Sequence, residues 1–292
     1  MADFYKYHSL GNDYIIIDPT RLKLCLKLNQ ENIKLICNRN YGIGSDGILV
    51  GPIINNHQIT FRIFNPDGSE AERSGNGIMI FSLYLYTHGY VNTKKFNLYT
   101  KAGQVSVDII NLKTNLIKVS IAKYSFLSKM IPSDLNNQEM LNQEVILLGK
   151  KEIIHCVNVG NSHCVLIKNN ISEQQTKKLG PILENHPLFP EKINVQFVKI
   201  ISRSNINIEI WERGVGYTLS SGTSSLSASC VAYRLNYIDN DVTVNMKGGS
   251  MRVQIIGNQL FLIGNVCKVF QGVFQGSLRS KVLENESTSS YI

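Results

Sequence analysis

The segments Arg73-Ser74-Gly75-Asn76-Gly77 and Ser220-Ser221-Gly222-Thr223-Ser224 decide the fold, because each places a serine and a glycine directly before a helix-like stretch. The two central serines are 147 positions apart. A second pair of Gly-Asn segments begins at Gly11 and Gly160, 149 positions apart, and each leads into an apolar run. Two offsets that agree this closely, and that equal about half the chain, indicate a duplicated domain.

The pattern within each half predicts a strand-rich fold with one long helix. The expected helices, at residues 76–88 and 223–236, carry few charges and are expected at the centre of their halves. Expected strands include residues 61–64, 97–100, 104–107, 207–210 and 251–256. We therefore expect an α+β fold of two pseudo-symmetric domains. Each would be a barrel-like sheet around a central helix, with the site in the cleft between them.

The 292 residues suit two domains of ordinary size. We place the N-terminal domain at residues 1–122, with residues 264–278 returning to it, and the C-terminal domain at 123–263. Residues 279–292 are polar and are expected to form a flexible tail.

Composition excludes several classes of protein. Apolar residues make up 43% and charged residues 18%, which is enough apolar surface to form a core. The net charge of +8 is spread along the chain, so it favours anionic substrates over nucleic acid. The six cysteines form no CxxC pair, which argues against a zinc site or a disulfide scaffold. With no long apolar run and no export pattern at its start, the chain is expected in the cytoplasm, without a membrane partner.

The paired Ser-Gly turns have a functional and a structural interpretation. Each turn places a hydroxyl beside unpaired backbone N–H groups at the positive end of a helix, and this arrangement binds carboxylates. The alternative is that Ser74 and Ser221 are ordinary N-caps. The symmetric duplication favours a shared site.

Residues 65–77 (NPDGSEAERSGNG) and 212–223 (ERGVGYTLSSGT) resemble the two signatures of the diaminopimelate epimerase family. The resemblance continues at residues 11–13, 41–47, 160–163 and 184–190 and so covers nearly the whole chain. It implies an isomerase that interconverts L,L- and meso-diaminopimelate, a precursor of lysine and peptidoglycan, without pyridoxal phosphate or any other cofactor. In the family, one cysteine thiolate removes the α-proton and a second cysteine thiol returns a proton on the opposite face.

Ser74 and Ser221 stand at the positions of these two cysteines, so both thiols are missing. A thiol has a pKa of about 8.5 and a water-like hydroxyl one near 15.7, a difference worth roughly 10 kcal/mol. A helix N-terminus contributes only about 1 to 2 kcal/mol. The resemblance therefore implies a site that is silent or strongly impaired in proton transfer.

The other site residues match the family. By resemblance, Ser74, Ser221, Glu212 and His163 form the catalytic set, and Glu212 would accept the substrate ammonium. The expected substrate-binding residues are Asn12, Asn65, Gly75, Asn76, Asn161, Asn194, Arg213, Gly222 and Thr223. No metal site is expected, because no cluster of potential ligands has metal-binding spacing. Met79 and Tyr217 depart from the family, which usually has an arginine and an acidic residue there.

Two alternatives remain. In the first, the chain isomerises a different substrate with a more acidic α-proton, using Glu212, His163 or Tyr217 as acid or base. In the second, it is a non-catalytic amino-acid binder. The expected partner is a small amino-acid substrate, and a homodimer is left open.

Overall fold

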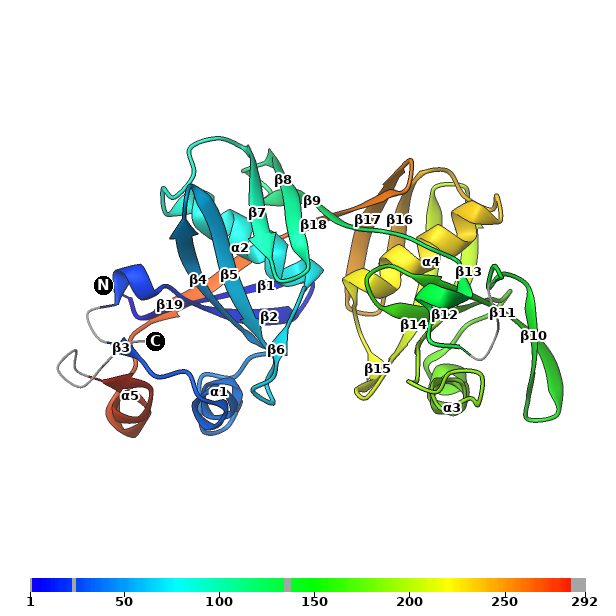
Figure 1. The fold of residues 1–292 in the computed structure, drawn as a ribbon, viewed down its shortest axis with the longest axis horizontal. Helices are drawn as coiled ribbons and strands as arrows, with labels where there is room; N and C mark the ends of the chain where they lie inside the picture. The colour runs from blue at the N-terminus through cyan, green and yellow to red at the C-terminus, as the bar shows by residue number, and fades with distance from the viewer. Residues whose placement is uncertain (1, 23–24, 134–137, 285–292) are drawn as a thin grey trace. The chain divides into compact units, whose positions relative to one another are not determined.

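The computed structural model describes residues 2–22, 25–133 and 138–284. The chain divides into two compact units, unit 1 with residues 1–119 and 265–292 and unit 2 with residues 120–264 (Figure 1). Among the described residues, no helix has the length and apolar character needed to cross a bilayer.

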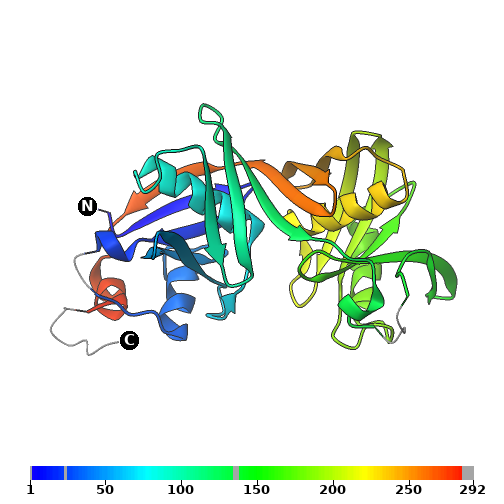
Figure 2. The same cartoon turned by 45° about the horizontal axis from the view of Figure 1, so that its top comes forward.

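Unit 1 is a single curved sheet that wraps around one buried helix. Its strand order is β19 (Cys267–Gly272), β1 (Phe4–Ser9), β2 (Asn12–Ile17), β4 (Ile48–Asn55), β5 (Gln58–Phe64), β7 (Lys95–Thr100), β8 (Gly103–Asn111) and β9 (Leu116–Lys123). The pairs β2–β4 and β5–β7 are parallel and the others antiparallel. Helix α2 (Gly75–Thr87) contacts β1, β2 and β4 in the first half of this strand order and β8 in the second half. It contacts both because the sheet curls around it (Figure 2).

Unit 2 repeats this arrangement. Its strand order is β10 (Gln143–Leu147), β11 (Lys150–Asn158), β12 (Ser162–Ile167), β13 (Asn194–Ser202), β14 (Asn205–Glu212), β16 (Asp241–Met246), β17 (Gly249–Ile256) and β18 (Gln259–Asn265). Here β12–β13 and β14–β16 are the parallel pairs. Helix α4 (Gly222–Arg234) contacts β11, β12, β13, β14, β16 and β17. The two units therefore share strand order and direction, as the sequence repeat predicts.

Shorter elements complete each repeat. The first parallel crossover runs through α1 (Gln30–Cys37) in unit 1 and α3 (Glu173–Glu184) in unit 2, and the second runs through the central helices, which the short strands β6 (Glu70–Ala71) and β15 (Gly216–Thr218) precede. The remaining elements are η1 (Pro19–Arg21), η2 (Ser128–Met130), β3 (Cys25–Leu26), α5 (Gly276–Val282) and β20 (Leu283–Glu284).

The central helices are buried around almost their whole circumference. In α2 every residue from Gly75 to Leu85 is buried, and in α4 nearly every residue from Gly222 to Ala232. A helix enclosed in this way needs no polar face, which explains why both predicted stretches carry few charges. The predicted helices overlap α2 and α4 to within two residues at each end, and the five predicted strands lie within β5, β7, β8, β14 and β17.

The prediction of a flexible tail at 279–292 is wrong for its first residues. Residues 279–282 complete α5, and β20 follows and pairs with β3. Val282 and Leu283 are buried in the cluster that also contains Ile33 and Ile36 of α1. These apolar side chains anchor the segment, whereas the composition of the whole stretch suggested only a polar end. Residues 285–292 lie outside the described residues.

Candidate active site

In unit 1, the turn before α2 holds Ser74 at the N-cap position. Its Oγ accepts a hydrogen bond from the backbone N–H of Gly77 at 3.1 Å. The same oxygen lies 2.9 Å from the hydroxyl of Tyr14, which β2 presents to the turn. The Ser74 hydroxyl is therefore oriented by one backbone group and one phenol.

Asn76, the second residue of α2, is buried and bonded on one side only. Its Nδ2 donates to Oδ1 of Asn12 at 2.9 Å. Its Oδ1 is buried and has no hydrogen-bond partner among the described residues. A buried acceptor without a donor is costly, so this oxygen is a natural contact for a donor on a bound molecule.

Asn12 is itself held by a charged network. Its Nδ2 donates to Asp46 at 3.1 Å, and Arg39 bridges Asp46 and Asp13. Lys6, which is buried, also pairs with Asp13. Burial acts to raise the pKa of Asp13, but hydrogen bonds from Arg39 and Lys6 outweigh it and hold this pKa at about 2. The network fixes the start of β2.

In unit 2, Ser221 is the N-cap of α4 and accepts from the backbone N–H of Ser224 at 3.3 Å. Its Oγ lies 3.4 Å from Oγ1 of Thr223. Glu212, the last residue of β14, also interacts with this turn: burial raises the pKa of its carboxyl, and hydrogen bonds with Ser221 and Thr218 partly oppose the rise. A serine hydroxyl thus contacts a carboxyl that holds its proton more tightly than usual.

His163 lies at the start of β12 and is fully buried. Its Nε2 is 2.8 Å from Oδ1 of Asn161, and its Nδ1 is 3.1 Å from Oε1 of Gln196. Gln196 in turn donates to Ser224 Oγ at 3.1 Å. Burial lowers the pKa of His163 to about 3, so the imidazole is neutral at physiological pH. This chain of side chains connects Asn161 to the first turn of α4.

The loop after β14 is braced by two buried side chains. Asn194 accepts from the backbone N–H of Arg213 at 3.0 Å, and Glu184 accepts from that of Gly214 at 2.9 Å. The guanidinium of Arg213 donates to the carbonyl of Glu191 at 3.1 Å, and Arg213 is exposed. The backbone at this position is therefore fixed while the cationic side chain faces solvent.

The remaining predicted positions have clear local roles. Asn65 donates to Ser69 Oγ at 2.9 Å within the turn that follows β5. Gly75 and Gly222 are the first residues of α2 and α4. Met79 is fully buried in the core. The Tyr217 hydroxyl donates to Glu209 at 2.6 Å.

Sequence reasoning missed Tyr14 and Gln196 as neighbours of these turns. The repeat contained a signal for the first, because Tyr14 occupies in its Gly-Asn segment the position of His163 in the other. Gln196 gave no such signal, since only the parallel pairing of β12 with β13 places it opposite Val165 and near His163. Ser74 and Ser221 do have the geometry of N-caps, as the structural interpretation supposed. Within the described ranges, no group of three or more His, Cys, Asp or Glu side chains could hold a metal ion.

Comparison with known proteins assigns the chain to a family. The family model for diaminopimelate epimerase matches residues 4–127 and 155–269. Diaminopimelate epimerase 2 of Nostoc sp. is 46% identical over 272 residues, which cover 92% of this chain and 94% of that protein. Diaminopimelate epimerase of Methanothermobacter thermautotrophicus is 33% identical over 282 residues, covering 94% of this chain and 98% of that protein.

Solved structures with low sequence identity share the fold. A probable proline racemase of Agrobacterium radiobacter has a TM-score of 0.66 at 14% identity, and a hydroxyproline epimerase of Agrobacterium vitis has 0.65 at 11%. Both alignments cover 94% of this chain and 93% of the other. Given the family match along both units, the chain belongs to the diaminopimelate epimerase family and is a cofactor-independent isomerase of the epimerase class.

Proposed function

We propose that the chain binds diaminopimelate and interconverts its L,L and meso forms at a rate far below that of members with two thiols. Family membership together with two equivalent Ser-Gly turns, one in each unit, carries the proposal. Ser74 and Ser221 occupy the two proton-transfer positions, and each hydroxyl is already oriented by a backbone N–H.

The first residues of both helices are suited to a carboxylate. The first two N–H groups of an α-helix have no intrahelical acceptor, so those of Gly75 and Asn76, and of Gly222 and Thr223, are available to an anion. The unsatisfied Oδ1 of Asn76 adds an acceptor for a donor such as the substrate's α-ammonium. Carboxylate and ammonium of one amino-acid group would both be satisfied.

We assign different roles to the other members of the set. Glu212 contacts Ser221 and carries a raised pKa, so it is the side chain best able to exchange a proton near that turn. His163 is neutral and buried, with its two nitrogens within hydrogen-bond distance of Asn161 and Gln196, so we assign it a positioning role. Asn65, Asn161, Asn194 and Arg213 would hold the remote amino-acid group, with the exposed guanidinium taking its carboxylate.

The test is the double variant Ser74→Cys/Ser221→Cys with L,L-diaminopimelate in deuterated buffer. Replacing a hydroxyl by a thiol lowers the pKa of the base by about seven units, so we expect exchange of the α-proton to rise at least about a thousandfold. Mass spectrometry measures the exchange, and a chiral separation measures the meso product.

Ser172→Cys is the matched control. Ser172 is the N-cap of α3 and accepts from the N–H of Gln175 at 3.2 Å, so it has the same capping chemistry on a helix without a proposed substrate role. Its exchange rate should equal that of the unaltered chain. A folded double variant that binds diaminopimelate without exchanging its α-proton would overturn the proposed reaction.

The contact between Glu212 and Ser221 favours one second candidate. A carboxyl with a raised pKa could by itself deprotonate a substrate whose α-proton is already acidic, without any thiol. In that case the unaltered chain would exchange protons on such a substrate, Glu212→Gln would abolish the exchange, and the double cysteine variant would not improve it. Binding without exchange for every candidate would identify a non-catalytic amino-acid binder.

A further inference from the structure

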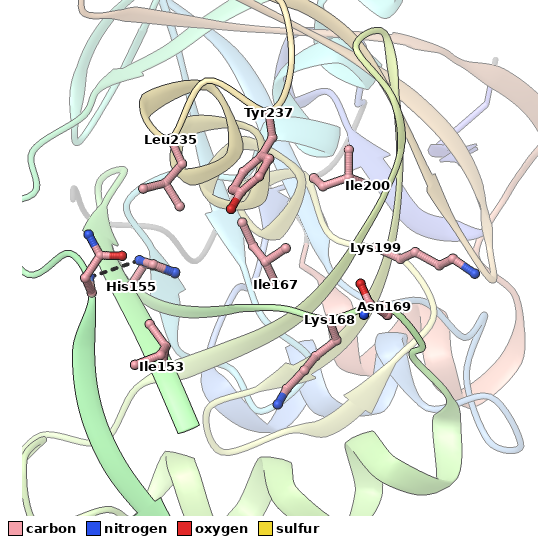
Figure 3. Close-up of a pocket in the computed structure, with 10 residues that line it drawn as sticks. Ile153, His155, Ile167, Lys168, Asn169, Lys199, Ile200, Leu235 and Tyr237 are labelled. Atoms are coloured by element: carbon pink, nitrogen blue, oxygen red, sulfur yellow. Dashed lines mark hydrogen bonds between the residues drawn. The ribbon is translucent and has the colours of Figure 1, made fainter. Parts of the chain in front are cut away.

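Unit 2 contains a pocket of about 560 Å³ that the proposed reaction does not use (Figure 3). Its lining includes Ile153 and His155 of β11, Ile167 of β12, Lys199 of β13, and Leu235 and Tyr237 after α4. This volume lies in the range of small-molecule sites. Ser221 lies at the opposite end of α4, a 13-residue helix of about 20 Å. The pocket is therefore separate from the Ser221 turn.

The duplicated fold shows what fills the same place in unit 1. His155 in unit 2 occupies the position of Tyr5 in unit 1. The residues opposite them on the neighbouring strands, Val165 and Ile16, stand at the same place in the two halves of the sequence repeat. When α2 and α4, each 13 residues long, are aligned from their first residues, Val231 takes the position of Tyr84 and Leu235 that of His88. In unit 1, Tyr84 stacks on His88 at 4.1 Å between ring centroids and lies 5.1 Å from Tyr5. An aromatic cluster in unit 1 thus corresponds to smaller side chains and open space in unit 2.

The central member of the unit 1 cluster is a phenol. The Tyr84 hydroxyl donates to Asp18 at 2.6 Å. Ile167 takes the position of Asp18 in unit 2, so both the phenol and its acceptor are replaced by aliphatic groups there. The space left in unit 2 accordingly suits a planar ring, which would regain the van der Waals contacts that a void lacks.

A buried hydrogen-bond donor reaches this space. His155 is 5% exposed, and its Nδ1 accepts from the backbone N–H of Asn142 at 3.1 Å. The proton of the neutral ring therefore sits on Nε2, which has no hydrogen-bond partner among the residues that the structure describes. Figure 3 shows the imidazole and the Tyr237 ring both directed toward the region of Ile167.

Cationic side chains line the side of the pocket across from His155. Lys168 is paired with Glu152, which neutralises it. Lys199 is half-buried, and its side-chain ammonium has no ion pair or hydrogen bond within residues 2–22, 25–133 and 138–284. In Figure 3 the Lys199 side chain starts across the pocket from His155 and extends away from it, so its ammonium supplies a positive charge at the outer end of the pocket.

We propose that this pocket is a second ligand site, which binds a para-substituted aromatic acid. The ring packs between Ile153, Ile167 and Leu235, an oxygen at its far end accepts from His155 Nε2, and the carboxylate pairs with Lys199. The site does not depend on the reaction proposed above, since none of these side chains belongs to the Ser74 or Ser221 turn.

Calorimetric titration of the full chain with 4-hydroxyphenylacetate tests the proposal. We expect saturable binding of one molecule per chain. Leu235→Trp fills the pocket and should weaken this binding at least tenfold, a change of about 1.4 kcal/mol. Lys199→Met removes a partly solvated ion pair and should weaken it about two- to fivefold, and added salt should reduce the difference.

Lys178→Met, at an exposed lysine of α3, is the matched control and should bind as the unaltered chain does. Circular dichroism and thermal denaturation establish that each variant is folded. If Leu235→Trp does not fold, Lys199→Met alone tests the proposal. This variant should bind 4-hydroxyphenylacetate more weakly than the unaltered chain, and its binding should depend less on salt. No saturable binding by the unaltered chain, or equal binding by folded Leu235→Trp, would overturn the proposal whatever the outcome of the cysteine experiment.

Discussion

Single side chains at the two helix N-termini combine structural and chemical roles. Ser74 and Ser221 satisfy a backbone N–H of the first helical turn, which stabilises a helix by about 1 kcal/mol. The same hydrogen bond holds the side-chain oxygen beside free N–H groups of the turn. Capping and substrate contact are therefore compatible at these residues, so the N-cap geometry does not by itself argue against a substrate site.

Glu212 makes a prediction for the pH dependence of stability. Because burial raises its pKa, the folded chain binds this proton more tightly than the unfolded chain does. Its contribution to stability is therefore most favourable below the ordinary carboxyl pKa and is lost as the pH rises through the raised value. Glu212→Gln removes this pH-dependent loss of stability. The variant should therefore have a higher Tm than the unaltered chain at about pH 8 and a similar Tm at about pH 4.

Glu144→Gln is the control for this comparison, since Glu144 is exposed and pairs with an exposed lysine, Lys151. Its Tm difference from the unaltered chain should be small at both pH values. A Glu212→Gln variant that is less stable than the unaltered chain at the higher pH would contradict the raised pKa.

At the scale of elements, the packing of α3 on β14 depends on a glycine. A Cβ built on Gly180 would lie 2.5 Å from Cγ of Trp211, and Trp211 is held by a 2.7 Å hydrogen bond to Glu184. Alanine improves helix propensity by about 1 kcal/mol, but overpacking of this kind costs about 1 to 3 kcal/mol. Gly180→Ala should therefore destabilise the chain by about 1 kcal/mol, against the propensity scale.

Urea denaturation measures this effect, and the fluorescence of Trp211, the single tryptophan, reports the local change. Gln174→Ala, at an exposed position of the same helix, should leave stability within about 0.5 kcal/mol. An increase in stability for Gly180→Ala would show that the indole moves aside at no cost.

At the scale of the whole molecule, each unit is built around one enclosed helix. Opening α2 or α4 to solvent requires the surrounding sheet to separate, whereas α1 and α3 each have an exposed face. Amide hydrogen exchange should therefore be slowest in α2 and α4. Exchange that is slower in α1 or α3 than in the central helices would contradict this order of stability.

Much of the architecture follows from the sequence alone. The two offsets of 147 and 149 positions predicted the duplication, and low-charge stretches predicted both central helices. These features are local or periodic, so a single chain displays them. The family resemblance, carried by residues 65–77 and 212–223, was also confirmed. The roles of the individual site residues stay predictions.

Contacts between distant segments were decided only by the tertiary structure. Tyr14 meets Ser74, Gln196 meets His163, and Asn12 is fixed through Asp46, each across more than 30 positions of sequence. The unit 2 pocket is likewise lined by Ile167, which stands where unit 1 has Asp18, and Val231 of α4 stands where unit 1 has Tyr84, the partner of Asp18. Periodicity in a sequence specifies which face of an element is buried, but side-chain partners depend on how strands pair and how volumes fill the space between them.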